Sequence, residues 1–181
     1  MAASADPGRL TSPRVQVRRA EPADAAAIAE IILPTFREGS TYAIDTQISE
    51  ADALAYWLAP DKQTFVAEDG SLIVGTYYLR TNHAGNGSHV CNCGYMTRPG
   101  HTGRGIARTL CQHSLDHGRA AGYRAMQFNY VVSTNERAVR LWQSMGFEII
   151  GRLPGAFRHP TQGFVDSLVM YQSLLTPAPR A

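Results

Sequence analysis

The sequence has few cysteines and no long apolar run, and each scarcity excludes a class of protein. Cysteine occurs three times in 181 residues. Cys91 and Cys93 lie too close along one predicted strand to pair comfortably with each other, so we expect a reduced, cytoplasmic setting. No run of about 18 apolar residues occurs, and residues 1–13 lack a basic segment followed by an apolar core. We therefore expect neither a membrane span nor an export signal.

Lysine is nearly absent, and charge of either sign is low. The 17 basic and 15 acidic residues give a formal net charge of +2, and they are well mixed along the chain. Apart from Lys62, every lysine or arginine position holds arginine, which we attribute mainly to codon composition. The basic stripe typical of nucleic-acid-binding proteins is missing. We therefore expect no nucleic-acid partner.

Length and composition fit one domain. A chain of 181 residues with 44% hydrophobic content can bury one sizeable core and leaves little room for a second. We expect a single domain at residues 14–175. The flanking residues 1–13 and 176–181 are small, polar or proline-containing, and we predict that both are disordered tails.

Hydrophobic periodicity predicts seven strands and four helices. The strands are expected at residues 15–19, 64–68, 72–79, 88–96, 125–131, 147–153 and 164–174, and the helices from Pro22 to near Pro34, after the capping residue Ser49, at 104–121 and at 135–145. We expect Leu54, Trp57 and Leu58 to face inward, Asp69-Gly70 to form a hairpin turn, and a long connection before residue 164. Residues 35–48 read as a functional loop.

The most informative segment is Thr102-Gly103-Arg104-Gly105-Ile106-Ala107, which joins a predicted strand to a predicted helix. A glycine-rich turn at a helix start presents free backbone N–H groups beside the positive end of the helix dipole. Such a turn is a suitable binding site for a diphosphate. The alternative is that glycine is needed there only for close packing.

A second pattern lies downstream, where Asn135 opens a run that contains Ala138, Leu141, Trp142 and Gly146-Phe147. Together the two patterns resemble the GNAT superfamily of acyl-CoA-dependent N-acyltransferases. The resemblance extends over residues 15–175. Two departures from the family are that Thr102 replaces the usual Gln or Arg and that Trp142 replaces the usual Tyr.

The resemblance implies a fold and a cofactor. The fold is of the α/β (α+β) class, with a mixed, mostly antiparallel sheet, helices on both faces, and splayed fourth and fifth strands, here residues 88–96 and 125–131. The pantetheine of acetyl-CoA inserts between these strands, and a backbone N–H near Tyr95 or Met96 stabilises the developing oxyanion. The implied cofactor-binding residues are Met96, Thr97, Thr102, Gly103, Arg104, Gly105, Ile106, Ala107, Asn135 and Trp142.

The fourth predicted strand offers no glutamate as a general base. It carries Asn92, and the adjoining strand carries Asn129; both could hold the substrate while a water carries the proton. The alternative is that each amide satisfies backbone groups where the sheet splays. Since Trp142 lacks a phenolic proton, Tyr95, Tyr130 or water could serve as the acid, or the thiolate could leave unassisted.

Other side chains allow both a functional and a structural interpretation. Phe36, Arg37 and Tyr42 could line an acceptor pocket or anchor an ordinary loop. His113 and His117 lie one helical turn apart, but no third ligand at a telling spacing accompanies them, so we expect no metal.

The sequence therefore predicts an acetyl-CoA-dependent N-acetyltransferase that acts by direct attack in a ternary complex. The segments around Asn92 and Asn129 are similar to a branch of fungal N-acetyltransferases that act on proline analogues, which implies a small amine substrate, an amino acid or proline-like analogue. Similar proteins are commonly homodimers. The competing hypothesis is a non-catalytic acyl-CoA-binding sensor or complex subunit.

Overall fold

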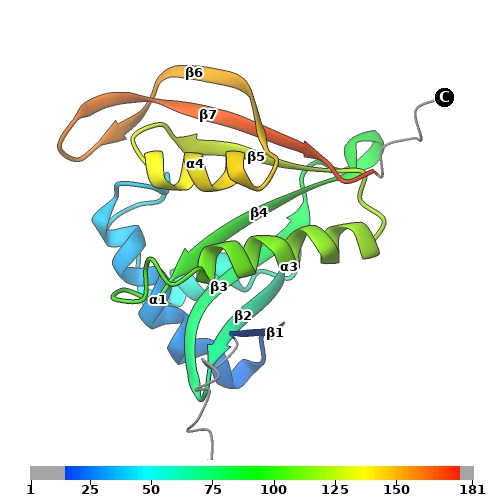
Figure 1. Cartoon of the computed structure of the whole chain (residues 1–181). Helices are drawn as coiled ribbons and strands as arrows, with labels where there is room; N and C mark the ends of the chain where they lie inside the picture. The colour runs from blue at the N-terminus through cyan, green and yellow to red at the C-terminus, as the bar shows by residue number, and fades with distance from the viewer. Residues whose placement is uncertain (1–14, 176–181) are drawn as a thin grey trace, which may run out of the picture.

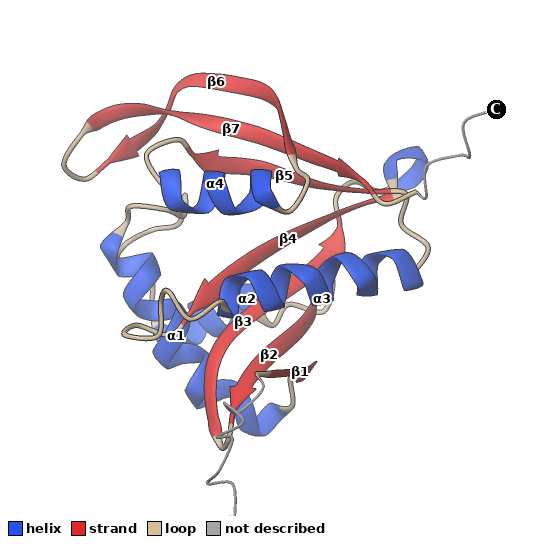
Figure 2. Cartoon of the chain, in the orientation of Figure 1, coloured by secondary structure: helices blue, strands red, loops and turns tan. Residues whose placement is uncertain are grey.

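A seven-stranded sheet forms the centre of the computed structural model, which describes residues 15–175 (Figures 1 and 2). The tails predicted at residues 1–13 and 176–181 lie outside the described residues. The strands are β1 (Gln16–Arg19), β2 (Gln63–Asp69), β3 (Leu72–Thr81), β4 (Val90–Thr97), β5 (Ala125–Val132), β6 (Glu148–His159) and β7 (Gly163–Ser173). The helices are α1 (Ala25–Glu38), α2 (Glu50–Trp57), α3 (Ile106–Ala120) and α4 (Glu136–Ser144), with short 3₁₀ turns η1 (Pro22–Asp24) and η2 (Gly85–Gly87).

The sheet is mixed and mostly antiparallel, in the order β1-β2-β3-β4-β5-β7-β6. Only β4 and β5 are parallel, and their pairing covers just Val90 with Ala125 and Cys91 with Met126. Beyond these two pairs the strands diverge, as Figure 1 shows. The predicted fold class and the splayed fourth and fifth strands are therefore confirmed.

Helices cover both faces of the sheet, and each face has its own apolar core. On one face α3 and α4 pack over a cluster that includes Leu110, Met126 and Met170. On the other, α1 and α2 bury Ile32 and Trp57 against the sheet. Because side chains alternate along a strand, β2, β3 and β4 each contribute to both cores. Among the described residues, no helix is long and apolar enough to cross a membrane.

Helix α1 extends four residues beyond Pro34, so the predicted end of this helix was wrong. Proline inside a helix removes one backbone hydrogen bond and costs about 3 kcal/mol. The cost is offset because Phe36 continues the apolar stripe of the helix and is fully buried. The helix ends at Gly39, whose φ of 65° is the left-handed conformation that glycine adopts readily.

The last hairpin also differs from the prediction. Strand β6 continues to His159, and only a short turn separates it from β7, where a long connection was expected. A register shift between Leu153 and Phe157 accommodates Pro154 and Gly155. Since β6 is an edge strand, the missing N–H of Pro154 need not cost a ladder hydrogen bond.

Two smaller expectations concern α2 and the first hairpin. Asp52 N–H donates to Ser49 Oγ at 3.1 Å, so the predicted cap is confirmed. Leu58, expected to face inward, follows the end of the helix and is 37% exposed. The β2–β3 turn lies one residue later than predicted, because Asp69 pairs with Leu72 and the turn is Gly70-Ser71.

Candidate functional site

The divergence of β4 from β5 leaves part of β4 without a strand partner on one side. On its other side β4 pairs with β3, and Arg98 N–H, just past its end, donates to the Val74 carbonyl at 2.8 Å. Alternate residues of an antiparallel strand direct their peptide groups to opposite neighbours. The backbone groups of Cys93, Tyr95 and Thr97 therefore face the gap. An extended ligand can pair with such an edge.

Met96 has the opposite backbone orientation. It lies opposite Thr76 in the β3–β4 register, two residues from the Arg98 hydrogen bond, so its peptide groups face β3. Its side chain packs in the core beneath α1 and α2. The peptide groups of Met96 therefore do not face the gap, whereas those of Tyr95 and Thr97 do; Met96 still lines the larger cavity.

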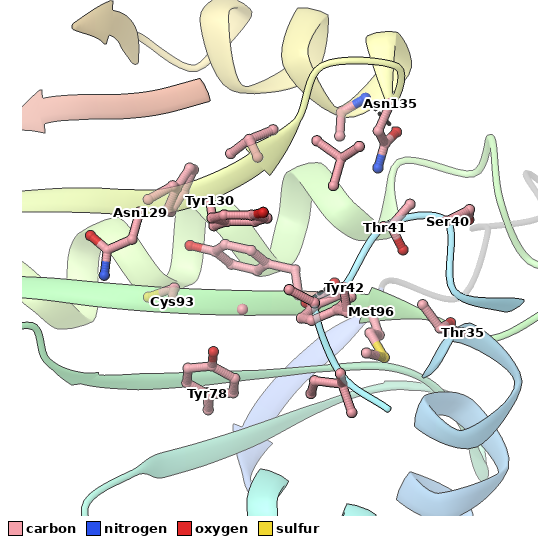
Figure 3. A pocket seen from close by; sticks show the side chains of 18 of the residues that line it. Thr35, Ser40, Thr41, Tyr42, Tyr78, Cys93, Met96, Asn129, Tyr130 and Asn135 are labelled. Atoms are coloured by element: carbon pink, nitrogen blue, oxygen red, sulfur yellow. Dashed lines mark hydrogen bonds between the residues drawn. The ribbon is translucent and has the colours of Figure 1, made fainter. Parts of the chain in front are cut away.

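Two neighbouring cavities, which share several lining residues, open beside the gap. The larger, about 490 Å³, extends from the C-terminal end of α1 across β4 to β5, and Figure 3 shows Tyr42, Asn129 and Asn135 around it. The smaller, about 370 Å³, lies between the first turns of α3 and α4. Thr97 and Trp142 line both cavities. The two spaces therefore meet at the open edge of β4.

The smaller cavity has the features of an anion site. Gly103 and Gly105 line it with φ angles of 86° and 80°, followed by Ile106 and Ala107 at the start of α3. Left-handed glycines let the backbone N–H groups turn toward a ligand at a helix N-terminus. No carboxylate occurs among the described residues that line the smaller cavity. These features fit the diphosphate of coenzyme A.

The smaller cavity has two arginines that were not predicted from the sequence, while the predicted Arg104 is not among its lining residues. Arg108 and Arg137 line this cavity, whereas Arg104 lines neither cavity. Arg108 donates to Ser144 Oγ at 2.7 Å, which connects α3 to α4. Nothing in the sequence alone marks Arg137, because its place at the cavity depends on the convergence of the first turns of α3 and α4. The guanidinium groups of Arg108 and Arg137 are suited to phosphate recognition.

Asn135 and Trp142 stand where the two cavities meet. Asn135 Oδ1 accepts a hydrogen bond from Ala138 N–H at 3.3 Å, so this residue caps α4 and lines both cavities. Trp142 is 8% exposed, with its ring 5.0 Å from that of Tyr95. Thr102 lines both cavities as well. Trp142 therefore serves chiefly as an apolar wall.

The Tyr95 hydroxyl lies in the core, against α3. It is 2.6 Å from Ser114 Oγ, and Ser114 in turn donates its proton to the Cys111 carbonyl at 2.7 Å. The Tyr95 proton is consequently committed to Ser114. Burial raises the pKa of Tyr95 well above its ordinary value. This arrangement does not favour the expected role of Tyr95 as a general acid.

Asn92 bridges the two strands where they begin to separate. Its Nδ2 donates to the Gln127 carbonyl of β5 at 2.8 Å, one residue beyond the last β4–β5 backbone pair. This contact supports the alternative in which the amide satisfies a backbone group at the splay. Asn92 also lines the larger cavity, so both interpretations are compatible with its position.

Asn129 belongs to a chain of side-chain amides on the same side of the sheet. Its Oδ1 accepts from Gln127 Nε2 at 2.8 Å, and its Nδ2 donates to Asn82 Oδ1 at 2.7 Å. Asn129 lines the larger cavity (Figure 3). The network fixes its orientation toward that space.

Of the three residues expected in an acceptor pocket, only Tyr42 lines the larger cavity. Its hydroxyl donates to the Tyr95 carbonyl at 3.0 Å, and burial raises its pKa. Phe36 is fully buried, and Arg37 is exposed and lines neither cavity, because α1 continues through both positions. Glu38, which was not among the predicted residues, lines the cavity instead.

The known sequences that resemble this chain include N-acyltransferases. The Acetyltransferase (GNAT) family profile matches residues 25–147. N-acetyltransferase aca1 of Schizosaccharomyces pombe is 28% identical over 148 residues, which cover 72% of this chain and 71% of that protein. L-amino acid N-acyltransferase MnaT of Escherichia coli is 25% identical over 144 residues, which cover 77% of this chain and 83% of that protein.

Solved structures share the same architecture. A GCN5-related N-acetyltransferase from Kribbella flavida is 42% identical and superposes with a TM-score of 0.81, covering 88% of this chain and 97% of that one. The yncA protein of Salmonella typhimurium, determined with its cofactor acetyl-CoA, is 23% identical with a TM-score of 0.78 and covers 93% and 98% of the two chains.

Proposed function

The chain belongs to the Acetyltransferase (GNAT) family, and from this premise we propose that it transfers the acetyl group of acetyl-CoA to the amine of an amino acid or a proline-like analogue. The observation that carries the proposal is the junction of two unlike cavities at the open edge of β4. One is cationic and bounded by a helix start, and the other is lined by amides and hydroxyls. Donor and acceptor can therefore meet without a covalent enzyme intermediate.

The smaller cavity and the gap hold the donor. The N–H groups from Gly103 to Ala107, together with Arg108 and Arg137, bind the diphosphate. The Tyr95 N–H and the Thr97 peptide groups orient the extended arm, while the Tyr95 carbonyl is held by the Tyr42 hydroxyl. Acetyl-CoA, when bound, supplies a thioester-activated acetyl group that an amine can attack directly.

The larger cavity holds the acceptor. Asn92 and Asn129 project into it from the strands on either side of the gap, and amides can both donate to and accept from a small polar substrate. MnaT is named for its action on L-amino acids, which supports the same substrate class here. The similarity to the proline-analogue branch narrows the proposal to small or cyclic amino acids.

A water molecule carries away the proton of the attacking amine. Strand β4 offers no carboxylate, and Glu38 is the only carboxylate among the described residues that line the larger cavity. Its Oε1 accepts a hydrogen bond from Ser40 at 2.9 Å. Glu38 is therefore our candidate for receiving the proton through water.

Turnover of acetyl-CoA with a panel of amino acids and simple amines tests the proposal. Thiol release should require an amino acid, and Asn92→Ala and Asn129→Ala should lower turnover more than they weaken coenzyme A binding measured by calorimetry. Asn86→Ala is the control, since Asn86 is exposed in η2 and lines neither cavity. Coenzyme A binding without thiol release for any amine would favour the sensor hypothesis instead.

We also propose that residues 14–175 act as one catalytic domain in the cytoplasm, as a homodimer. The three cysteines are free and buried, in keeping with a reducing compartment. Light scattering on the purified protein gives the oligomeric state, and a monomeric mass would reject the dimer.

A further inference from the structure

The larger cavity contains one cationic side chain, Arg80 of β3, which the proposed chemistry leaves unused. Glu38 and Arg80 are the charged groups among the described residues that line this space. The Arg80 guanidinium makes a long contact with Asp61, 3.4 Å between Nη1 and Oδ2, and both side chains are substantially exposed. Such a pair contributes little. Arg80 therefore retains donors for another acceptor.

Two buried N–H donors, Nε of Arg80 and Nδ2 of Asn82, have no hydrogen-bond partner within residues 15–175. Arg80 lines the larger cavity, and Asn82 lies behind its lining residue Asn129, to which it is hydrogen-bonded. Asn82 lies one residue past the end of β3, but its N–H still donates to the Val90 carbonyl at 2.8 Å, in register with the pairing of Arg80 and Asn92, so the two side chains fall on the same face of the sheet. A buried unsatisfied donor costs about 1–3 kcal/mol. Two such donors on one face favour an acceptor-rich partner there.

The register of the sheet places these donors next to the proposed substrate-holding amides. Arg80 lies directly opposite Asn92 in the β3–β4 ladder, and Asn82 Oδ1 accepts from Asn129 Nδ2 at 2.7 Å. Cross-strand partners on one face are close neighbours. A group bound by Arg80 and Asn82 would therefore lie one side chain away from the point where β4 and β5 separate.

A second cation increases the positive potential at this end of the cavity. The Lys62 ammonium lies 3.5 Å from the ring centroid of Tyr56 and 4.7 Å from that of Tyr78. Burial lowers the pKa of Lys62 to about 8, with the charge of Arg80 contributing in the same direction and Asp61 opposing it. Asp61 is the one carboxylate that offsets these two cations in the described contacts.

We propose that Arg80, together with Asn82, binds the carboxylate of the acceptor amino acid and so directs its α-amine toward the gap. The inference rests on the proposed function, because it assumes that the acceptor enters the larger cavity. A guanidinium pairs with a carboxylate through two parallel hydrogen bonds, which fix orientation as well as affinity. Acceptors without a carboxylate leave both buried donors unpaired and are disfavoured for that reason.

The decisive experiment compares an amino acid with its carboxamide in steady-state kinetics. In Arg80→Gln the KM for the amino acid should rise on the order of 10- to 100-fold, while the KM for the carboxamide and the Kd for coenzyme A change little. Arg80→Lys should recover part of the loss, because it keeps the charge. Arg37→Gln is the matched control, since Arg37 is exposed and lines neither cavity.

Asp61→Asn separates substrate binding from a structural role of the Arg80–Asp61 pair. If Arg80 binds the carboxylate, removing its competing partner leaves the KM for the amino acid unchanged or lower. A rise in KM that matches Arg80→Gln would overturn the inference, as would equal losses of amino acid and carboxamide in Arg80→Gln. A wild-type protein that acetylates only amines without a carboxylate would reject the proposed function itself. Amino acid turnover that is indifferent to Arg80 would reject only this subsite.

Discussion

The glycine that precedes α3 provides a sharp test of the donor site. Gly105 has a φ of 80°, and a methyl group added at its Cα would meet no atom within 4 Å. Gly105→Ala therefore introduces no clash in the free protein. It introduces a side chain into a left-handed conformation, which costs roughly 1–2 kcal/mol. The free energy of unfolding should fall by about that amount.

The effect on ligand binding should be larger than this strain alone would suggest. Gly105 lines the smaller cavity, so the added methyl either occupies part of the diphosphate site or turns the local N–H groups away from it. A hydrogen bond to a charged group contributes about 1.5–3 kcal/mol. Losing one such bond raises the Kd for coenzyme A roughly 10- to 150-fold.

A control glycine separates strain from ligand contact. Gly122, after the end of α3, has a φ of 84° and equally open surroundings, but it lines neither cavity. Urea unfolding should show similar destabilisation in Gly105→Ala and Gly122→Ala, and calorimetry should show weakened coenzyme A binding only in the former. Equal coenzyme A affinities in the two folded variants would refute the placement of the diphosphate.

Three further predictions concern charge and hydrogen bonding. Arg137→Ala should raise the Kd for coenzyme A about tenfold and make it less sensitive to salt, because one cation of the smaller cavity is lost; calorimetry at several salt concentrations checks this. Lys62, the only lysine, should titrate near pH 8 in NMR after ¹³C-methylation, and at higher pH in Arg80→Gln; a midpoint near 10.5 would contradict the burial argument. Because the unfolded state binds this proton more readily, the free energy of unfolding should decrease as pH falls from 10.5 to 8 and the buried lysine becomes charged. Tyr42→Phe should lower the free energy of unfolding by about 1 kcal/mol, since the Tyr95 carbonyl loses its donor; unchanged urea unfolding would argue against that bond.

Periodicity and turn chemistry were sufficient for the fold. The order of strands and helices followed from local pattern, and the resemblance supplied the splay of β4 from β5. The main error on a helix came at Pro34, where a local rule was overridden by the burial of Phe36 in tertiary packing. The same error misplaced Phe36 and Arg37 in the site.

The donor site was easier to predict than the acceptor site. The segment from Gly103 to Ala107 forms a helix start whose function depends on consecutive backbone groups, which a sequence motif can encode. Arg137 and Arg80 reach their cavities from separate elements, and no spacing along the chain relates them. Their contribution depends on strand register and on the convergence of two helices, which only the folded structure shows.

The bridge from Asn92 to the Gln127 carbonyl has a consequence for binding kinetics. The Asn92 side chain occupies the Gln127 carbonyl, the next acceptor on β5, so backbone pairing between β4 and β5 does not continue past this point in the free protein. The gap between β4 and β5 is therefore already open in the free protein, and the pantetheine arm can enter it without first breaking backbone hydrogen bonds between the strands. Entry should then be limited by encounter and orientation rather than by a slow opening of the sheet.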